Sequence, residues 1–252
     1  NDVFLVNVQD LDTVKIDVDF HEKQRQLKAN ITAPHINYSG YELDSLAFTM
    51  NTDKDTFVFD LGFNEIKAGP LNIKKTIIKG NQANNELSLD FIAFHDKDKM
   101  IQIMSKISGD RERLRFHILP NDLILNKTAW NTPETNEIII TNKKLEFNDF
   151  RFYKDEQSVE ISNQLPSITK DHIAVNYKNF ELSEFLSYLN PDKQLATGNL
   201  NGDFILVEPF ADTGIVADLD IKNLSLMTVD MGTLSLNAKS LGGKSYDFNA
   251  AM

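Results

Sequence analysis

Few residues in this sequence have both the types and the spacing that catalysis or metal binding requires. The histidines lie at positions 21, 35, 95, 117 and 172, and none pairs with a second His or a Glu at helical metal-ligand spacing. No cysteine is present, which excludes a disulfide framework, a thiolate zinc site and a cysteine nucleophile. The sequence also lacks a glycine-rich phosphate loop and a nucleophile elbow. We therefore predict a protein that is not an enzyme and holds no metal or cofactor.

The segment His95-Asp96-Lys97-Asp98 comes nearest to a ligand cluster, because it offers an imidazole and two carboxylates. Lysines compete for those carboxylates, and charge clusters of this kind usually lie in solvated turns. We interpret this segment, and Asp53-Lys54-Asp55, as hairpin turns. Neither has the spacing of a calcium loop.

Trp130 is the only tryptophan, and two roles are open for it. Its ring could stack on a sugar, which would suit a glycan-binding module. A lone Trp more often belongs to the core or its rim, and we favour that role. The 17 phenylalanines have the same ambiguity, between an ordinary sandwich core and the lining of an apolar groove.

The net charge of -11 bears on the choice of partners. Nucleic-acid binding requires clustered Lys and Arg that replace counterions on phosphate, so we expect no nucleic-acid partner. The same charge disfavours adsorption to an anionic membrane surface. No run approaches the roughly 18 apolar residues of a membrane helix.

Alternation of apolar and polar residues with a period of two dominates the chain and predicts an all-β, antiparallel fold. Short polar breaks such as 51–55, 81–85, 96–99 and 109–112 indicate hairpin turns, so neighbouring strands should pair in a meander. The alternating apolar residues that we expect to share one face are Ile16, Val18, Phe20, Phe57, Phe59, Leu61, Leu89, Phe91, Ile103, Phe116, Leu219, Ile221, Leu234 and Leu236.

One segment, residues 181–189, predicts a short helix. Its apolar residues Leu182, Phe185, Leu186 and Leu189 follow helical spacing. We expect Asn179 to cap the start of this helix and Asn190-Pro191 to end it. The apolar stripe needs a partner, which we expect at the open edge or end of the sheet.

From Asn179 onward the chain resembles the TamB family of AsmA-like bacterial envelope proteins. The resemblance rests on Asn179-Phe180-Glu181-Leu182, on Gly198-Asn199-Leu200-Asn201-Gly202 and on Ile215 to Leu226 followed by Gly232-Thr233-Leu234. Gly69-Pro70-Leu71-Asn72 and the other Gly-x-Leu sequences each open a strand in this interpretation. The resemblance is most specific over residues 179 to 240.

This resemblance implies a long antiparallel sheet curled into a β-taco, an open U-shaped sheet whose concave face is apolar. It implies two successive segments, 1–178 and 179–252, within an internal or truncated fragment of a longer chain. Members of the family are periplasmic, are usually anchored in the inner membrane and meet an outer-membrane barrel of the Omp85 type. The implied function is conduction of phospholipid acyl chains along a hydrophobic groove for outer-membrane biogenesis.

On this basis the alternating apolar residues named above become candidates for the lining of a lipid groove. Each buried CH₂ of a tail would contribute roughly 0.8 kcal/mol to binding. Two alternatives stay open at this point. One is a closed β-sandwich that binds a glycan through Trp130, and the other is a non-catalytic scaffold for outer-membrane protein assembly that uses exposed sheet edges.

Overall fold

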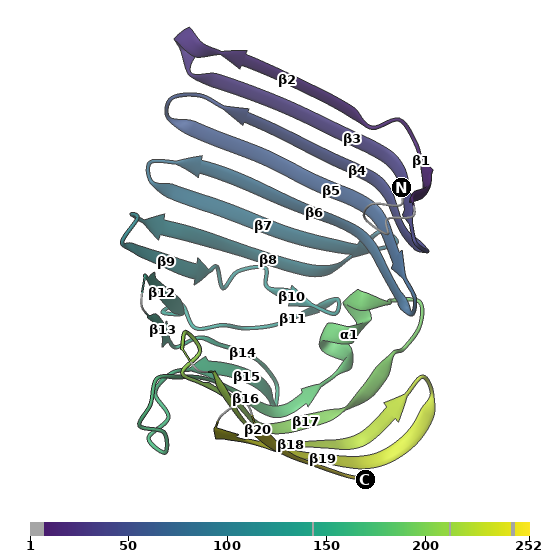
Figure 1. Ribbon diagram of the computed structural model, residues 1–252, viewed down its shortest axis with the longest axis vertical. Helices are drawn as coiled ribbons and strands as arrows, with labels where there is room; N and C mark the ends of the chain where they lie inside the picture. The colour runs from purple at the N-terminus through teal and green to yellow at the C-terminus, as the bar shows by residue number, and fades with distance from the viewer. Residues whose placement is uncertain (1–7, 143, 212, 243–244) are drawn as a thin grey trace.

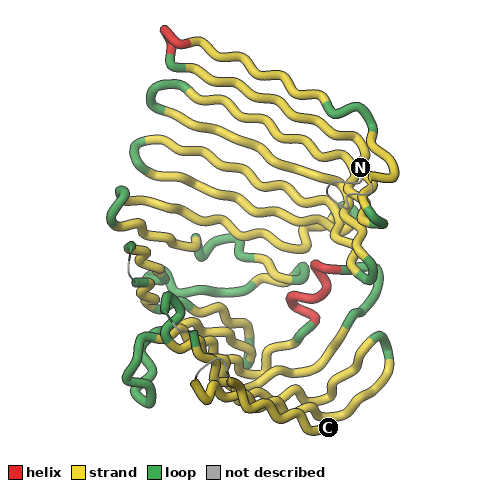
Figure 2. The backbone as a smooth tube through the Cα atoms, viewed as in Figure 1, coloured by secondary structure: helices red, strands yellow, loops and turns green. Residues whose placement is uncertain are grey.

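The computed structural model describes residues 8–142, 144–211, 213–242 and 245–252, which form two antiparallel sheets and one short helix (Figure 1). Strands make up 70% of the structure and helix 4%, which confirms the predicted all-β class. Figure 2 shows that strands dominate both halves of the molecule and that the helix lies between the two sheets. Neither sheet closes on itself.

The first sheet is a meander in which most strands pair with their neighbours in the chain. Its order is β1-β3-β4-β5-β6-β7-β8-β9-β12-β13, with β2 paired to β3 and the small β10–β11 hairpin attached to β8. The bounds are β1 (Val8–Leu11), β2 (Lys15–His21), β3 (Gln26–Tyr38), β4 (Tyr41–Thr52), β5 (Thr56–Ala68), β6 (Leu71–Ala83), β7 (Glu86–His95), β8 (Asp98–Gly109), β9 (Arg113–Ile118), β10 (Ile124–Leu125), β11 (Thr128–Ala129), β12 (Glu137–Thr141) and β13 (Leu145–Asn148). A 3-10 turn, Glu22–Gln24, joins β2 to β3.

The second sheet continues the meander in the order β14-β15-β16-β17-β18-β19-β20. Its bounds are β14 (Arg151–Lys154), β15 (Gln157–Ser162), β16 (His172–Glu181), β17 (Ala196–Val207), β18 (Gly214–Leu226), β19 (Val229–Gly242) and β20 (Ser245–Ala251). The helix α1 (Ser183–Leu189) lies between β16 and β17. The meander is thus divided into two sheets between β13 and β14.

Turn chemistry explains why the long strands keep their register. Asn84 and Asn85, between β6 and β7, both have positive φ, 52° and 61°, which matches the twist of a tight two-residue hairpin. The Asp53 carboxylate accepts hydrogen bonds from the N–H groups of Asp55 and Thr56, 2.8 Å each, and so closes the β4–β5 turn. The predicted hairpin positions are confirmed.

A buried core joins the two sheets. Side chains from both sheets and from the intervening loops meet there: Ile118, Leu123, Trp130, Phe147 and Phe150 are buried, and Ile103, Phe116, Phe152, Ile161 and Phe180 pack against them. The side-chain amide of Asn163, which follows β15 of the second sheet, links the two sheets by hydrogen bonds to β13. It donates to the Leu145 carbonyl at 2.8 Å and accepts from the Phe147 N–H at 3.3 Å. Trp130 is 2% exposed and lies in this core, as favoured above.

The predicted short helix is confirmed, but its N-terminal cap and its docking differ from the prediction. It starts at Ser183, and Asn179 does not cap it, because Asn179 lies in a bulge of β16 and its N–H donates to the Asn201 side chain at 2.8 Å. The predicted end is confirmed, with Asn190 as the C-cap residue. The helix does not cover an edge; its Tyr188 ring instead meets the Phe91 ring of the first sheet at 5.8 Å.

The Gly-x-Leu sequences also differ from the prediction that each opens a strand. Gly69 does precede β6. Gly198 lies inside β17 and Gly232 inside β19, each beside an irregularity in strand pairing. These two glycines lie at bulges or irregularities within a strand and not at its start, which is a common position for glycine in sheets.

Candidate functional site

The strand register assembles the predicted apolar residues of the first sheet into three adjacent rows. One row runs across seven strands through Ile16, Ile31, Phe48, Leu61, Ile78, Phe91 and Ile103. The next contains Val18, Ala29, Met50, Phe59, Gly80, Leu89, Ser105 and Ile118, and the third contains Phe20, Leu27, Thr52, Phe57, Gln82, Leu87, Ile107 and Phe116. All ten predicted residues of this sheet therefore share one face.

The second sheet repeats this arrangement with the remaining four predicted residues. Leu219 pairs with Leu236, and Ile221 pairs with Leu234, so that all four lie on one face of β18 and β19. Leu200 of β17 continues the second of these rows. We call the face of each sheet that carries these rows its inner face.

Both inner faces turn toward the same interior. In the core, Ile103 and Phe116 of the first sheet and Ile161 and Phe180 of the second pack around the same buried residues. The helix lies in this interior as well, because Tyr188 contacts an inner-face residue of the first sheet, Phe91 (Figure 1). The predicted residues are thus brought together by face, although the core and the helix separate the two sets.

Exposure changes along the inner face of the first sheet. At the β2 edge, Ile16, Val18 and Phe20 are 64%, 62% and 65% exposed. In the middle strands, Phe57 and Phe59 are half-buried and stack on one another with ring centroids 5.4 Å apart. The inner face is therefore open to solvent at the β2 edge and covered where it reaches the core.

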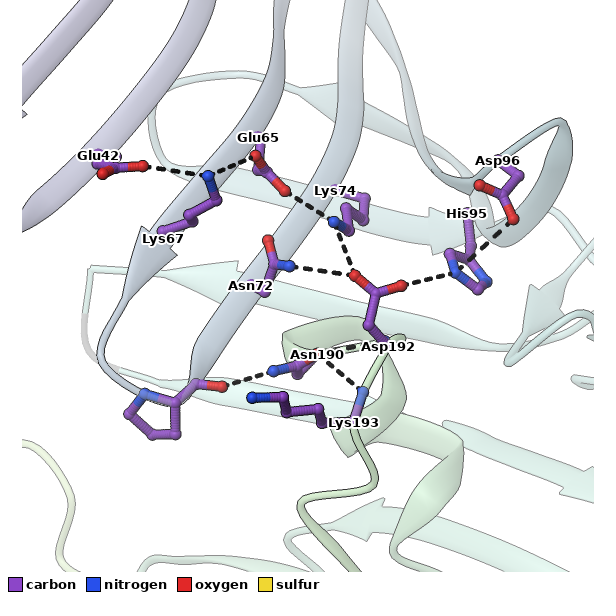
Figure 3. Close-up of polar contacts among 11 residues, drawn as sticks. Glu42, Glu65, Lys67, Asn72, Lys74, His95, Asp96, Asn190, Asp192 and Lys193 are labelled. Carbon is purple, nitrogen blue, oxygen red and sulfur yellow. Dashed lines mark hydrogen bonds and ion pairs between the residues drawn. The ribbon is translucent and has the colours of Figure 1, made fainter.

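A charged network occupies one end of the same inner face (Figure 3). The Lys67 ammonium lies 3.1 Å from both Glu42 and Glu65, and Lys74 lies 2.7 Å from Glu65. Asp192, in the loop after α1, then accepts from Lys74 at 2.8 Å. The network fastens the loop that follows the helix to β6.

The charges of this network shift the pKa values of its members. The Lys74 ammonium lowers the pKa of Asp192, with a smaller contribution from His95, and it is also the main cause of the lowered pKa of Glu65. In return, Asp192 and Glu65 raise the pKa of Lys74. The pKa of Lys67 is raised by its hydrogen bonds to Glu42 and Glu65. Each shift favours the charged form, so the network is a set of satisfied ion pairs.

The contacts of three polar residues near the helix were not predicted from the sequence: those of His95, which was interpreted only as part of a hairpin turn, and those of Glu184 and Lys154, which were not singled out. His95 contacts Asp192 at 3.2 Å and Lys127 at 3.0 Å, so the His95–Asp98 hairpin turn holds the end of the network. Glu184 of α1 is 4% exposed and pairs with Lys154 at 2.5 Å. The Lys154 ammonium also lies over the Trp130 ring, 5.3 Å from its centroid. Their partners are distant in sequence, so no local spacing could indicate these contacts.

Within the described ranges, no group of three or more His, Asp or Glu side chains is placed to hold a metal ion. No helix in the described part of the chain has the length and apolar character needed to cross a bilayer. The buried position of Trp130 gives its ring no solvent-facing surface on which a sugar could stack.

Comparison with known proteins adds no relative to this description: no family model, no curated protein and no solved structure matches the chain.

Proposed function

We propose that this protein carries the acyl chains of phospholipids along its inner face, as the resemblance to the TamB family suggests. The observation that supports this most is the first row, in which seven apolar residues follow one another in register from the exposed β2 edge to β8, while the two rows beside it are mainly apolar. On this proposal the protein works in the periplasm, anchored in the inner membrane, and an outer-membrane Omp85-type barrel receives the lipid.

The dimensions of the rows suit one lipid tail. Neighbouring strands lie about 4.8 Å apart, so a row across seven strands spans about 29 Å. The hydrocarbon core of a bilayer is about 30 Å thick and holds two opposed tails, so one tail needs about half that length. A row thus provides room for a whole tail and for its displacement along the sheet.

The chemistry of the rows also favours transport over storage. All seven side chains of the first row are hydrocarbon, so a tail on this row gains roughly the same free energy, about 0.8 kcal/mol per buried CH₂, at each position. Tails would enter at the open β2 edge, where Ile16, Val18 and Phe20 are exposed, and headgroups would stay in water along the open side of the groove.

A vesicle assay tests the proposal. Purified protein should accelerate transfer of a fluorescent phospholipid between donor and acceptor vesicles, and native mass spectrometry should detect bound phospholipid. Val18→Asp, at an exposed inner-face position, should reduce transfer several-fold. Asn30→Asp is the matched control, because it adds the same charge at an exposed position on the opposite face of β3. Equal transfer by both variants and the parent would refute the proposal.

A second candidate function is a scaffold that pairs with strands of other envelope proteins. It is favoured by the edge strand β20, where Tyr246 and Phe248 are 50% and 66% exposed. A photocrosslinker at position 248 should then capture outer-membrane barrel proteins, whereas capture of lipid alone would count against the scaffold.

A further inference from the structure

The underside of helix α1 faces a cavity of about 400 Å³ above the second sheet. Leu182, Phe185 and Leu186 of the helix form one wall. The remaining lining residues come from the inner face of the second sheet and from β10: Leu125, Phe152, Val159, Tyr177, Phe180 and Leu200. The cavity therefore lies between the helix and the sheet, with one side open to solvent.

The side chains that line the cavity carry almost no polar groups. Eight of its nine residues carry pure hydrocarbon side chains, and the exception is Tyr177. Burial raises the pKa of the Tyr177 hydroxyl, so this residue stays neutral in the physiological range. A charged or strongly polar ligand would lose its hydration here without compensation. The occupant must therefore present hydrocarbon to the cavity.

The volume limits how much hydrocarbon can enter. An apolar protein cavity of about 150 Å³ holds benzene, which has six carbons. On that scale, about 400 Å³ accommodates roughly sixteen carbons, which corresponds to one long alkyl chain and not to two. The size also lies within the usual range for small-molecule sites, about 300–1,000 Å³.

The exposure of the lining residues shows where the cavity opens. Phe185 belongs to the apolar stripe, yet it is 57% exposed. Leu200, in the floor, is 9% exposed. The cavity thus has a closed base on the sheet and an aromatic side chain at its opening, through which a chain can enter.

We propose that this cavity binds a single unbranched alkyl chain, such as the chain of a fatty acid or one acyl chain of a lipid, with the polar head left outside near Phe185. The inference rests on the proposed lipid-carrying function but names a distinct site. The alkyl chain would lie between α1 and the second sheet, apart from the rows of the first sheet.

Trp130 gives a built-in reporter for this site, because it is the only tryptophan and its ring centroid lies 6.0 Å from that of the lining residue Phe180. Titration with 9,10-dibromostearate should quench Trp130 fluorescence in a saturable way, and unbrominated stearate should reverse the quenching. Absence of saturable quenching would overturn the proposal.

Two variants locate the binding in the cavity. Val159→Phe, which fills its floor, and Phe185→Asp, which places a charge at its mouth, should each weaken dibromostearate binding at least tenfold. Phe210→Asp is the matched control, because Phe210 is 67% exposed and does not line the cavity. Tyr177→Phe should bind as the parent does. Unchanged affinity in both cavity variants, with native circular dichroism spectra, would refute the site.

The two proposals fail separately. If dibromostearate does not quench Trp130 but Val18→Asp still slows phospholipid transfer, then only the cavity is refuted. If dibromostearate binds as described but Val18→Asp and Asn30→Asp transfer lipid equally, then the cavity stands and transport along the first sheet is refuted.

Discussion

The Asp192 carboxylate lies 2.8 Å from the Lys74 ammonium, and this ion pair fastens the loop after α1 to the inner face of the first sheet (Figure 3). Lys74 holds Glu65 at the same time, at 2.7 Å. Asn190 reinforces the attachment, because its side chain donates to the Pro70 carbonyl at 2.7 Å. The position of the helix between the sheets therefore depends on polar contacts at its C-terminal end.

A double-mutant cycle between Lys74 and Asp192 should measure a favourable coupling of about 0.5–1 kcal/mol in the free energy of unfolding. The value is modest because the Asp192 side chain is 45% exposed and solvent screens the pair. Urea denaturation of Lys74→Met, Asp192→Asn and the double variant gives the coupling. Lys54 and Asp55 provide the control, because their side chains are 72% and 69% exposed and should show no measurable coupling.

Acid should destabilise the protein through the same carboxylates. The pKa values of Asp192 and Glu65 are lowered in the folded state from 3.8 and 4.5. The unfolded chain therefore binds more protons in this range, so their contribution is complete above about pH 4.5 and is lost as the pH falls through the folded-state pKa values. Urea denaturation at a series of pH values should show a shallower acid loss for Asp192→Asn. An acid slope identical to that of the parent would contradict the prediction.

Alkaline pH should destabilise the protein by deprotonating Lys74, whose pKa is raised above 10.5 in the folded state. Its contribution is complete below that value and is lost as the pH rises through its folded-state pKa. The Lys74→Met variant should therefore lose less stability than the parent as the pH rises. Unfolding followed by circular dichroism at a series of alkaline pH values measures this difference.

Phe59 covers Gly80 on the inner face, and this contact makes Gly80 sensitive to substitution. A Cβ at Gly80 would lie 2.0 Å from Cε1 of Phe59, so Gly80→Ala must displace the ring. We expect a loss of about 1–2 kcal/mol in the free energy of unfolding, typical of an overpacked site. Adding Phe59→Leu should recover most of it.

Gly62 is the matched control for Gly80. A Cβ there meets its nearest atoms at 3.5 and 3.8 Å, which is ordinary contact. Gly62→Ala should therefore be neutral or stabilise the strand by about 0.5–1 kcal/mol, since alanine loses less conformational freedom than glycine on folding. A comparable loss in both variants would show that the Phe59 ring is not the cause.

Lys154→Met should be severely destabilising, because it leaves the buried Glu184 carboxylate without its cation. Glu184 is 4% exposed, and its Oε2 atom makes no hydrogen bond within the described residues. We expect a loss of about 3 kcal/mol, measured by urea denaturation. The double variant Lys154→Met/Glu184→Leu should regain much of it, because no buried charge remains.

Lys144→Met is the control for this pair. Lys144 contacts Glu146 at 3.1 Å, but the two side chains are 53% and 40% exposed. Its removal should leave the free energy of unfolding unchanged within error. A similar loss for Lys144→Met and Lys154→Met would contradict the role given to burial.

The strands and their shared face could be predicted because, in a meander, the alternation of apolar and polar side chains in each strand stays in phase with that of its neighbours. Each tight hairpin keeps the side-chain parity, so Val18, Phe59 and Leu89 lie in one row although they come from three separate strands. Periodicity cannot say what covers a face, however. The division between β13 and β14 depends on long-range packing and on the Asn163 side chain.

The helix shows the same limit. The spacing of Leu182, Phe185 and Leu186 predicted an apolar stripe, yet the buried residue of α1 is Glu184. The buried glutamate is stabilised by Lys154, which lies in strand β14. Asn179 fitted a capping pattern, but tertiary pairing placed it in a bulge. Such outcomes depend on partners that local sequence does not reveal.

The meander connectivity has a consequence for how this chain folds. Each pairing from β3 to β9 joins neighbours in the sequence, so the first sheet can grow hairpin by hairpin with little loop-closure entropy at each step. The contact between Asn72 and Asp192 instead closes 120 residues. Docking of the helix should therefore be the late, slow phase of folding, and the open sheet should form before anything occupies its interior.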